Sequence, residues 1–436
     1  MTAGQIPPGQ SGWDEPPFAN ANQTERRPSS PPLSTLNPSS LLPARRPISP
    51  RLSCALDCMR WVAAAAVVFG HLRALAFVDY ADMKNTGMIF RGLFFLAGFG
   101  HQAVVVFFVL SGYLVGGEVL AALQNGTFDV RRYAVQRSAR LYAVYVVALA
   151  FGGLFDWVGI HQFNTNGLYS HHIRFVALDF PVVQRLDVAT LLGNLAFCQK
   201  LITPTFGSNE PLWSLANEAW YYVMFPLLAS ALWGTGSARK RFLVAVAFLG
   251  TAGFVRGPIL LYSSIWLLGL APRFLPRAII RWSQIPALAF CAMLVGVRCG
   301  WFARMSMFEK DLSVAIAFVL LMNSIEFRRA EPQRPRFAAL HKALAGFSYS
   351  VYLLHWPFAL LIVAITQQQF GYGLRMTRLD AGAAAFAVAL ILGAYGFAYG
   401  VAQFTEKQTP SIRAWVLRRL HMPVHASRVG AAPEFT

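Results

Sequence analysis

Apolar stretches separated by short polar and basic connections run through the chain from about residue 55 onward. A helix that spans a bilayer needs about 20 predominantly apolar residues. With that length as a window, the pattern predicts an all-α polytopic membrane protein with about ten transmembrane helices. The expected helices cover residues 57–78, 92–122, 138–157, 211–233, 241–256, 258–272, 284–300, 312–327, 345–367 and 380–404.

Basic residues in the short connections predict the orientation. The clusters Arg131 to Arg140, Arg239 to Arg241 and Arg328 to Arg336 fall on one side only if both termini are cytoplasmic. The apolar stretch 191–202 would invert the second cluster if it crossed. We therefore interpret it as an interfacial or re-entrant segment at the outer face.

Segment 92–122 is longer than one crossing requires, so we expect it to bend. Its glycines, Gly98, Gly100 and Gly112, offer places for the bend.

Composition agrees with the membrane interpretation, because 56% of the 436 residues are hydrophobic and 13% are charged. The net charge of +18 lies mostly in the connections, so we attribute it to topology and anionic lipid rather than to nucleic acid. Residues 1–50 are rich in Pro and Ser and predict a disordered cytoplasmic tail. Residues 408–436 predict a basic cytoplasmic tail.

Cysteine and histidine spacing predicts no metal site and no disulfide. The five cysteines lack paired spacing, and His161, His171 and His172 in the long connection 157–190 have no third ligand at a fixed distance. We interpret these histidines as solvated loop residues.

Arg60 and His71 interrupt the first predicted helix. Eleven residues on an α-helix give about 1100° of rotation, so both side chains project from one face, and the histidine lies about 16 Å deeper. Ionisable residues inside a membrane are costly and mark functional sites. An arginine that snorkels beside Asp57 and a histidine that only packs are the alternatives. The spacing favours a cation at the mouth and an imidazole at the bottom of a tunnel, where the histidine can act as a general base.

Arg137 and Arg140 form a second basic pair at the inner end of the third predicted helix. Guanidinium groups suit bidentate phosphate capture, although topology alone also explains the pair. With Arg60 on the same rim, three arginines can bind a phosphorylated donor.

Two further motifs place polar residues inside apolar runs. Ser111, Gly112 and Tyr113 suit either close helix packing or contact with a slender substrate. Ser214, Glu218 and Tyr222 share one helical face, and a carboxylate there needs a partner. We expect Glu218 at the outer side, where it assists His71 or binds a hydroxyl acceptor. The neighbouring Trp213 adds an aromatic face that suits sugar stacking or the membrane interface.

A last polar stripe, Ser348, Tyr352 and His355, follows the ninth predicted helix with i+4 and i+3 steps. Taken alone it is typical of a polar seam between packed helices.

Together these motifs resemble those of the integral-membrane acyltransferase family 3, whose bacterial members acylate envelope glycans and other acceptors. The similarity runs from about residue 56 to 404. It rests on five motifs that occur here as Arg60 with His71, Ser111 to Tyr113, Arg137 with Arg140, Trp213 to Glu218, and Ser348 to Pro357 including His355. The chain departs from the family pattern at Cys58 and Trp61, where glycines are usual, and at Ala219 to Tyr222. We expect no esterase-like domain of the kind that some members carry after the membrane part.

The resemblance implies a transmembrane acyltransferase domain at residues 51–407 in the bacterial inner membrane. It also implies acyl-coenzyme A, most often acetyl-coenzyme A, as the donor substrate and a glycan or other hydroxyl as the acceptor. His71 and Glu218 become the expected catalytic residues. Arg60, Arg137, Arg140 and Ser111 to Tyr113 become the donor side, and Trp213, Ser214, Tyr222 and His355 the acceptor side.

Three alternatives stay open at this point. Transfer can be direct or pass through an acyl-histidine. The second alternative is a secondary transporter that exports an acylated or anionic metabolite, because such a protein also has many transmembrane helices and buried ionisable residues. A non-catalytic partner in glycan synthesis is the third. The acceptor, the acyl chain length and the oligomeric state are not determined by the sequence.

Overall fold

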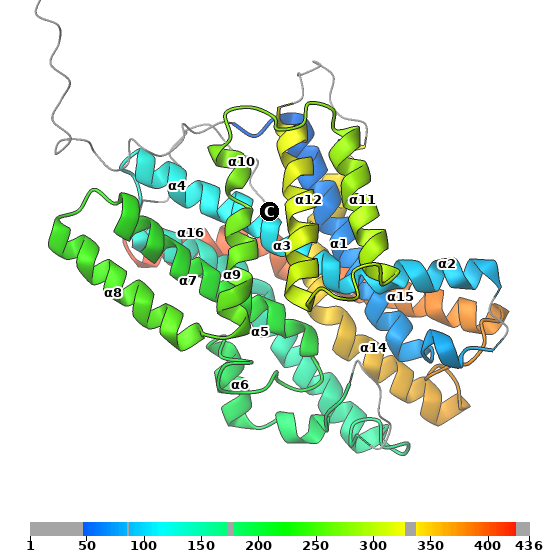
Figure 1. Cartoon of the computed structure of the whole chain (residues 1–436). Coiled ribbons are helices and arrows are strands. Elements are labelled where there is room, and N and C mark those ends of the chain that lie inside the picture. The colour runs from blue at the N-terminus through cyan, green and yellow to red at the C-terminus, as the bar shows by residue number, and fades with distance from the viewer. Residues whose placement is uncertain (1–46, 85–86, 172–177, 328–336, 424–436) are drawn as a thin grey trace, which may run out of the picture. The chain divides into compact units, whose positions relative to one another are not determined.

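The computed structural model describes residues 47–84, 87–171, 178–327 and 337–423. Every regular element among these residues is helical (Figure 1). The α-helices are α1 Pro50–Ala76, α2 Met88–Leu96, α3 Gly100–Ser111, α4 Gly117–Gln124, α5 Val130–Gln162, α6 Val188–Leu195, α7 Trp213–Trp233, α8 Ala238–Val255, α9 Pro258–Leu268, α10 Ala271–Phe274, α11 Gln284–Arg298, α12 Met307–Glu326, α13 Ala338–Ala345, α14 Ser348–Phe370, α15 Ala381–Phe404 and α16 Thr409–Arg419. The expected tail over residues 1–46 and the cluster Arg328 to Arg336 lie outside the described residues.

Side-chain caps explain where several of these helices begin. Ser49 accepts a hydrogen bond from the backbone N–H of Leu52 at the start of α1, Asp129 caps α5, and Asp380 caps α15. Such caps satisfy N–H groups that have no partner inside the helix. A short polar residue before an apolar run therefore fixes the start of each of these long helices.

Within the described ranges, five helical segments are long and apolar enough to cross a membrane: Pro50–Ala76, Met88–Gln124, Val130–Gln162, Ser348–Phe370 and Ala381–Arg419. The stretches Pro258–Phe274 and Gln284–Arg298 are apolar but shorter. Large apolar side chains on the outside of the fold, such as Phe242, Leu392 and Phe404, are exposed, as expected for a surface that faces lipid. The expected total of about ten crossings stays a prediction.

Segment 92–122 changes its helix type at two places, each beside glycines at which the sequence predicts a bend. A 3-10 turn at Ala97–Phe99 separates α2 from α3, and a π-helical turn at Gly112–Gly116 (labelled η5) separates α3 from α4. Gly100 faces the backbone of α1, and a Cβ on Gly112 would lie 1.8 Å from the carbonyl oxygen of Trp266 on α9. The glycines therefore let the helices on both sides approach closely.

Four other expected elements differ in detail. The interval 258–272 divides into α9 and α10, and the helix expected at 345–367 is α14, which begins at Ser348 after the separate short helix α13. Segment 191–202 overlaps only with the eight-residue helix α6, which at about 1.5 Å per residue is too short to span a bilayer. Residues 409–419, expected to belong to a basic tail, form helix α16 packed against α5.

The centre of the fold is built around α1 and α14. Helix α1 packs against α3, α12, α13 and α14, and α14 packs in turn against α5 and α15 (Figure 1). Helix α14 is the most buried of the long apolar segments, with 72% of its apolar window covered. Its polar residues therefore face protein rather than lipid.

Candidate functional site

One cavity of about 330 Å³ brings together most of the residues that the sequence singled out. It lies among residues of α1, α3, α4, α5, α7, α14 and α16. Its polar lining consists of Arg60, Ser111, Glu118, Gln136, Arg137, Arg140, Ser214, Glu218, Tyr222, Ser348, Tyr349, Tyr352, Thr409 and Arg413. Seven predicted site residues, namely Arg60, Ser111, Arg137, Arg140, Ser214, Glu218 and Tyr222, thus meet at one place.

The face shared by Ser214, Glu218 and Tyr222 on α7 points into this cavity. Ser111 donates a hydrogen bond of 2.8 Å to Oε1 of Glu218, and the hydroxyl of Tyr222 donates to the same oxygen. One turn further along α7, Ser214 shares a 2.6 Å hydrogen bond with the hydroxyl of Tyr352 on α14. The carboxylate of Glu218 therefore accepts hydrogen bonds from two hydroxyl groups. Ser214 and Tyr222 continue the polar face of α7 one turn before and one turn after it.

The expected partnership between Glu218 and His71 does not occur among the described residues. Glu218 is bound by Ser111 and Tyr222, and no hydrogen bond joins it to His71. Ser111, which the sequence assigned to the donor side, and Glu218, which it assigned to catalysis, are direct partners. The reason is packing: Gly112 lets α3 approach α9, and Trp266 donates a 3.0 Å hydrogen bond to Ser111 beside the carboxylate.

Gly112, Tyr113 and Trp213 do not line the cavity. Gly112 serves helix packing, as described above. Tyr113 is fully buried and donates to Glu326, while the guanidinium of Arg273 stacks over its ring. Trp213 packs edge-on against Phe108. The conformation places these three residues in the walls behind the site rather than on its surface.

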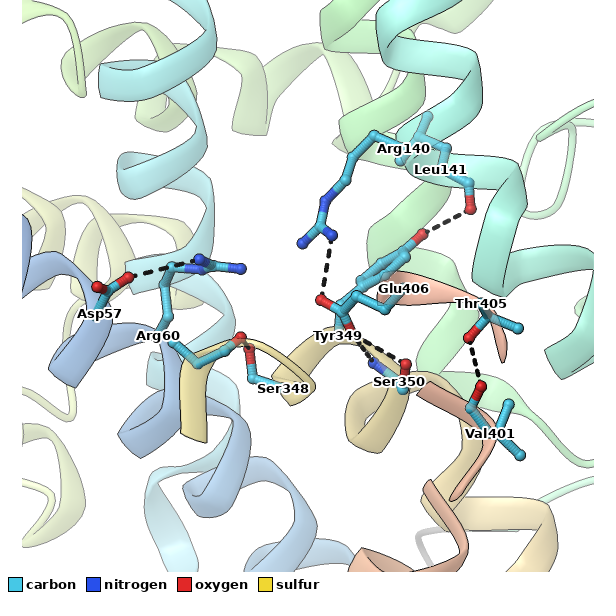
Figure 2. A network of polar contacts seen from close by, with 11 residues as sticks. Asp57, Arg60, Arg140, Leu141, Ser348, Tyr349, Ser350, Val401, Thr405 and Glu406 are labelled. Carbon is cyan, nitrogen blue, oxygen red and sulfur yellow. Dashed lines mark hydrogen bonds and ion pairs between the residues drawn. The ribbon is translucent and has the colours of Figure 1, made fainter. Parts of the chain in front are cut away.

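Each of the three predicted arginines faces a carboxylate. Arg60 lies 3.8 Å from Asp57 on its own helix, Arg137 pairs with Glu118, and Arg140 lies 3.1 Å from Glu406. Figure 2 shows the side chains of Arg60 and Arg140 reaching from α1 and α5 into the same space. These carboxylates hold the three arginines in position at the cavity. Asp57 and Glu406 do not line the cavity, whereas Glu118 and the arginines do.

Glu406 is the residue that the sequence reasoning missed. It is fully buried, its Oε1 accepts from Arg140, and its Oε2 accepts from both the backbone N–H and the hydroxyl of Ser350 on α14 (Figure 2). A buried carboxylate needs such partners, because an uncompensated charge is strongly destabilising. The available signal was an acidic residue directly after the last apolar run in a chain that is poor in acidic residues.

His71 and His355 form a pair beside the cavity but are not among its lining residues. Nδ1 of His71 lies 2.8 Å from Nε2 of His355, and the two rings stack with an interplanar angle of 13°. Trp356 packs edge-on against His71. The ring of Tyr352, which does line the cavity, lies 6.3 Å from that of His355. Tyr352 is thus a lining residue of the cavity whose ring is a neighbour of the histidine pair.

In a pair of neutral imidazoles, the hydrogen-bond partners of His71 and His355 decide which ring nitrogen carries the proton. Nδ1 of His355 lies 3.0 Å from the carbonyl oxygen of Val351, which can only accept, so Nδ1 carries the proton. Nε2 of His355 is then an acceptor for Nδ1–H of His71. Nε2 of His71 is left without a proton. This is the state that a general base requires.

The prediction of a loop is wrong for His161, because α5 continues to Gln162 and includes this residue in its last turn. There His161 contacts the carbonyl oxygen of Trp157. His171 lies 3.1 Å from Asp179, and His172 lies outside the described residues. Among the residues that the structure describes, no group of three or more His, Cys, Asp or Glu is arranged to hold a metal ion.

The fold and the cavity define a helical protein, with five segments fit to cross a membrane, that encloses an arginine-lined site. Residues 55–403 match the acyltransferase 3 family, described as an acyltransferase domain, and the chain belongs to this family. Nodulation protein 10 of Rhizobium leguminosarum bv. viciae is 27% identical over 205 residues, which are 45% of this chain and 49% of that protein.

A second relative, an uncharacterized protein of Haemophilus influenzae, is 26% identical over 129 residues, 28% of this chain and 46% of that protein. The chain thus spans about half the length of these curated relatives. No solved structure matches it significantly.

Proposed function

We propose that the protein is a membrane O-acyltransferase that moves an acyl group from acyl-coenzyme A, with acetyl-coenzyme A as the first donor to test. The acceptor is a hydroxyl of an envelope polysaccharide or a lipid-linked sugar. The observation that carries this proposal is the cavity, which joins three arginines to a polar path that ends next to a histidine pair.

The arginine end suits the phosphates of the donor. Arg60, Arg137 and Arg140 line one wall region, and guanidinium groups bind phosphate oxygens through paired, charge-assisted hydrogen bonds. Their carboxylate partners hold the side chains in extended positions before a ligand arrives. Such preorganisation reduces the conformational entropy that binding would otherwise cost.

The polar face of α7 suits the arm that links the phosphates to the thioester. Tyr222, Glu218 and Ser214 follow one another at steps of one turn, about 6 Å each. Tyr222 lies next to Arg137, and Ser214 contacts Tyr352 beside the histidines. The amide N–H groups of a pantetheine arm can donate to these oxygens on the way from Arg137 to Tyr352.

His71 is the general base of the proposed reaction. Its Nε2 takes the proton of the acceptor hydroxyl while that oxygen bonds to the thioester carbonyl carbon. The C–S bond then breaks, and the departing sulfur takes the proton from His71, which restores the neutral ring. His71 lies about 16 Å from Arg60 along α1. This separation is on the order of the length of a pantetheine arm.

Release of coenzyme A by the purified full-length protein tests this proposal. Acetyl-coenzyme A and an envelope-glycan acceptor should give free thiol and an acetylated product, whereas a secondary transporter would give neither. The variant Arg137→Ala, Arg140→Ala should raise the donor KM by about 100-fold or more, because two charge-assisted contacts are lost. An unchanged KM would place the donor elsewhere. The exposed Arg239→Ala serves as a matched control.

The acceptor is best identified in cells. Mass analysis of envelope glycans from a deletion strain should show the loss of one acyl group, and re-expression should restore it. Glycans identical to those of the parent strain would contradict the proposed acceptor class without affecting the donor assay.

A further inference from the structure

Helix α16 forms part of the cavity although it lies beyond the region that matches the family. The match ends at residue 403, whereas Thr409, Pro410 and Arg413 line the cavity from the first two turns of α16. Thr409 and Arg413 are four residues apart and therefore share one face of the helix. This segment contributes surface that the family motifs do not describe.

Two contacts hold α16 in this place. The helix packs against α5, which carries Gln136, Arg137 and Arg140 at the same cavity. Immediately before α16, the buried Glu406 is bound by Arg140 and Ser350, so the chain is fixed at the point where the helix begins (Figure 2). The position of Arg413 is thus coupled to that of the predicted donor-binding arginines.

The chemistry of this face suits an anion. With Arg413, four arginines line the cavity in the described part of the chain, together with the carboxylates of Glu118 and Glu218. The carboxylates of Asp57 and Glu406, which pair with Arg60 and Arg140, are not among the lining residues. The hydroxyl oxygen of Thr409 is buried and has no hydrogen-bond partner in the part of the chain that the structure describes. Helix α16, with the sequence TPSIRAWVLRR, contains no acidic residue that would compete for a bound anion. A phosphate is the ligand class that such a set of donors recognises.

We propose that α16 forms the subsite for the nucleotide end of the donor, with Arg413 and the hydroxyl of Thr409 as contacts to its phosphate oxygens. This inference rests on the proposed function, because it assumes an acyl-coenzyme A donor. The nucleotide end is favoured over the thioester end because Arg413 shares the cavity wall with Arg137 and Arg140. The thioester end is assigned to Tyr352 and the histidine pair.

Truncated donors test this subsite separately from the transfer reaction. Acetyl-coenzyme A carries the nucleotide phosphates, whereas S-acetylpantetheine carries the same thioester without any phosphate. Arg413→Ala should raise the KM for acetyl-coenzyme A about tenfold or more and leave the KM for S-acetylpantetheine unchanged. Thr409→Val should act in the same direction by a few-fold. Arg418→Ala, an exposed residue of the same helix, is the matched control and should change neither value.

The possible outcomes are distinguishable. An unchanged KM for acetyl-coenzyme A, or an equal rise with both donors, would overturn the subsite. A wild-type protein that uses neither donor would instead overturn the proposed function. If Arg413→Ala does not fold, Arg413→Lys keeps the charge but loses the bidentate geometry, and it should still raise only the KM for acetyl-coenzyme A.

Discussion

The two ends of the Arg60 to His71 interval on α1 have opposite electrostatic surroundings. Around Arg60, guanidinium and carboxylate groups alternate, with Asp57, Glu118 and Glu406 each paired to an arginine of the cavity. Around His71, the neighbours that the structure describes are a second imidazole and the ring of Trp356. One helix therefore connects a charged region to a region in which aromatic rings surround the proposed base.

In the proposed function, the charged region around Arg60 binds the donor, and the region of aromatic rings around His71 carries out the acyl transfer. A charged region holds arginines in place and can exchange a carboxylate partner for a phosphate at modest cost, because the guanidinium stays paired in both states. A base, in contrast, must remain unprotonated until the acceptor arrives. In neutral rings, the hydrogen bonds from His71 to His355 and from His355 to Val351 place the proton of His71 on Nδ1, so that Nε2 is the nitrogen left to accept a proton. The following predictions test the contrast, beginning with the largest effect.

Removal of the base should have the largest effect on turnover. His71→Ala should reduce kcat by about 10²-fold to 10⁴-fold, the usual contribution of general acid–base catalysis, with little change in the donor KM. Single-turnover assays of coenzyme A release by folded protein measure this. A His71→Ala protein with full kcat would refute the assignment of the histidine region to chemistry.

Removal of Glu406 should show how much the buried ion pair between Glu406 and Arg140 contributes to folding stability. Glu406→Ala leaves Arg140 and Ser350 without their buried acceptor and should cost about 3 kcal/mol or more of folding stability. Glu118→Ala is the matched control, because Glu118 is 49% exposed and its pair with Arg137 should contribute less than about 1 kcal/mol. Thermal unfolding of the purified variants compares the two; equal losses would contradict the distinction.

Replacement of His355 tests whether its hydrogen bond orients the ring of His71, and it should have the smallest effect of the three changes. His355→Gln can still offer an acceptor to Nδ1–H of His71, whereas His355→Asn reaches only the position that faces Val351. We expect kcat to fall about tenfold to a hundredfold in the His355→Asn variant and distinctly less in the His355→Gln variant. The pH–rate profile should shift only in the His355→Asn variant. If both variants fall equally and keep the wild-type pH profile, His355 has only a packing role.

The sequence predicted much of the site because helical periodicity is a local property. Spacing of four residues placed Ser214, Glu218 and Tyr222 on one face, and all three line the cavity. The changes of helix type in segment 92–122 lie beside predicted glycines for the same reason. The pairings across helices did not follow: neither the hydrogen bond from Ser111 to Glu218 nor the contact between His71 and His355 could be derived from spacing along one helix.

The C-terminal segment shows the same limit. Residues 409–419 read as a basic tail because their apolar content is low, yet they form α16 against α5. The ion pair between Arg140 and Glu406 joins residues that are 266 positions apart. No local pattern encodes a contact over that distance.

By itself, the sequence determined the helical membrane class, the family motifs and the faces on which Arg60, Arg137, Arg140 and Glu218 lie, because hydrophobic length and helical repeat are fixed by neighbouring residues. Only the tertiary structure decided which polar groups are partners. In a low-dielectric interior each buried charge or imidazole must find an acceptor or donor, and that partner is chosen by how distant helices pack. The packing of α14 against α1 and of α16 against α5 decided that His71 faces His355 and that Arg413 joins the arginines.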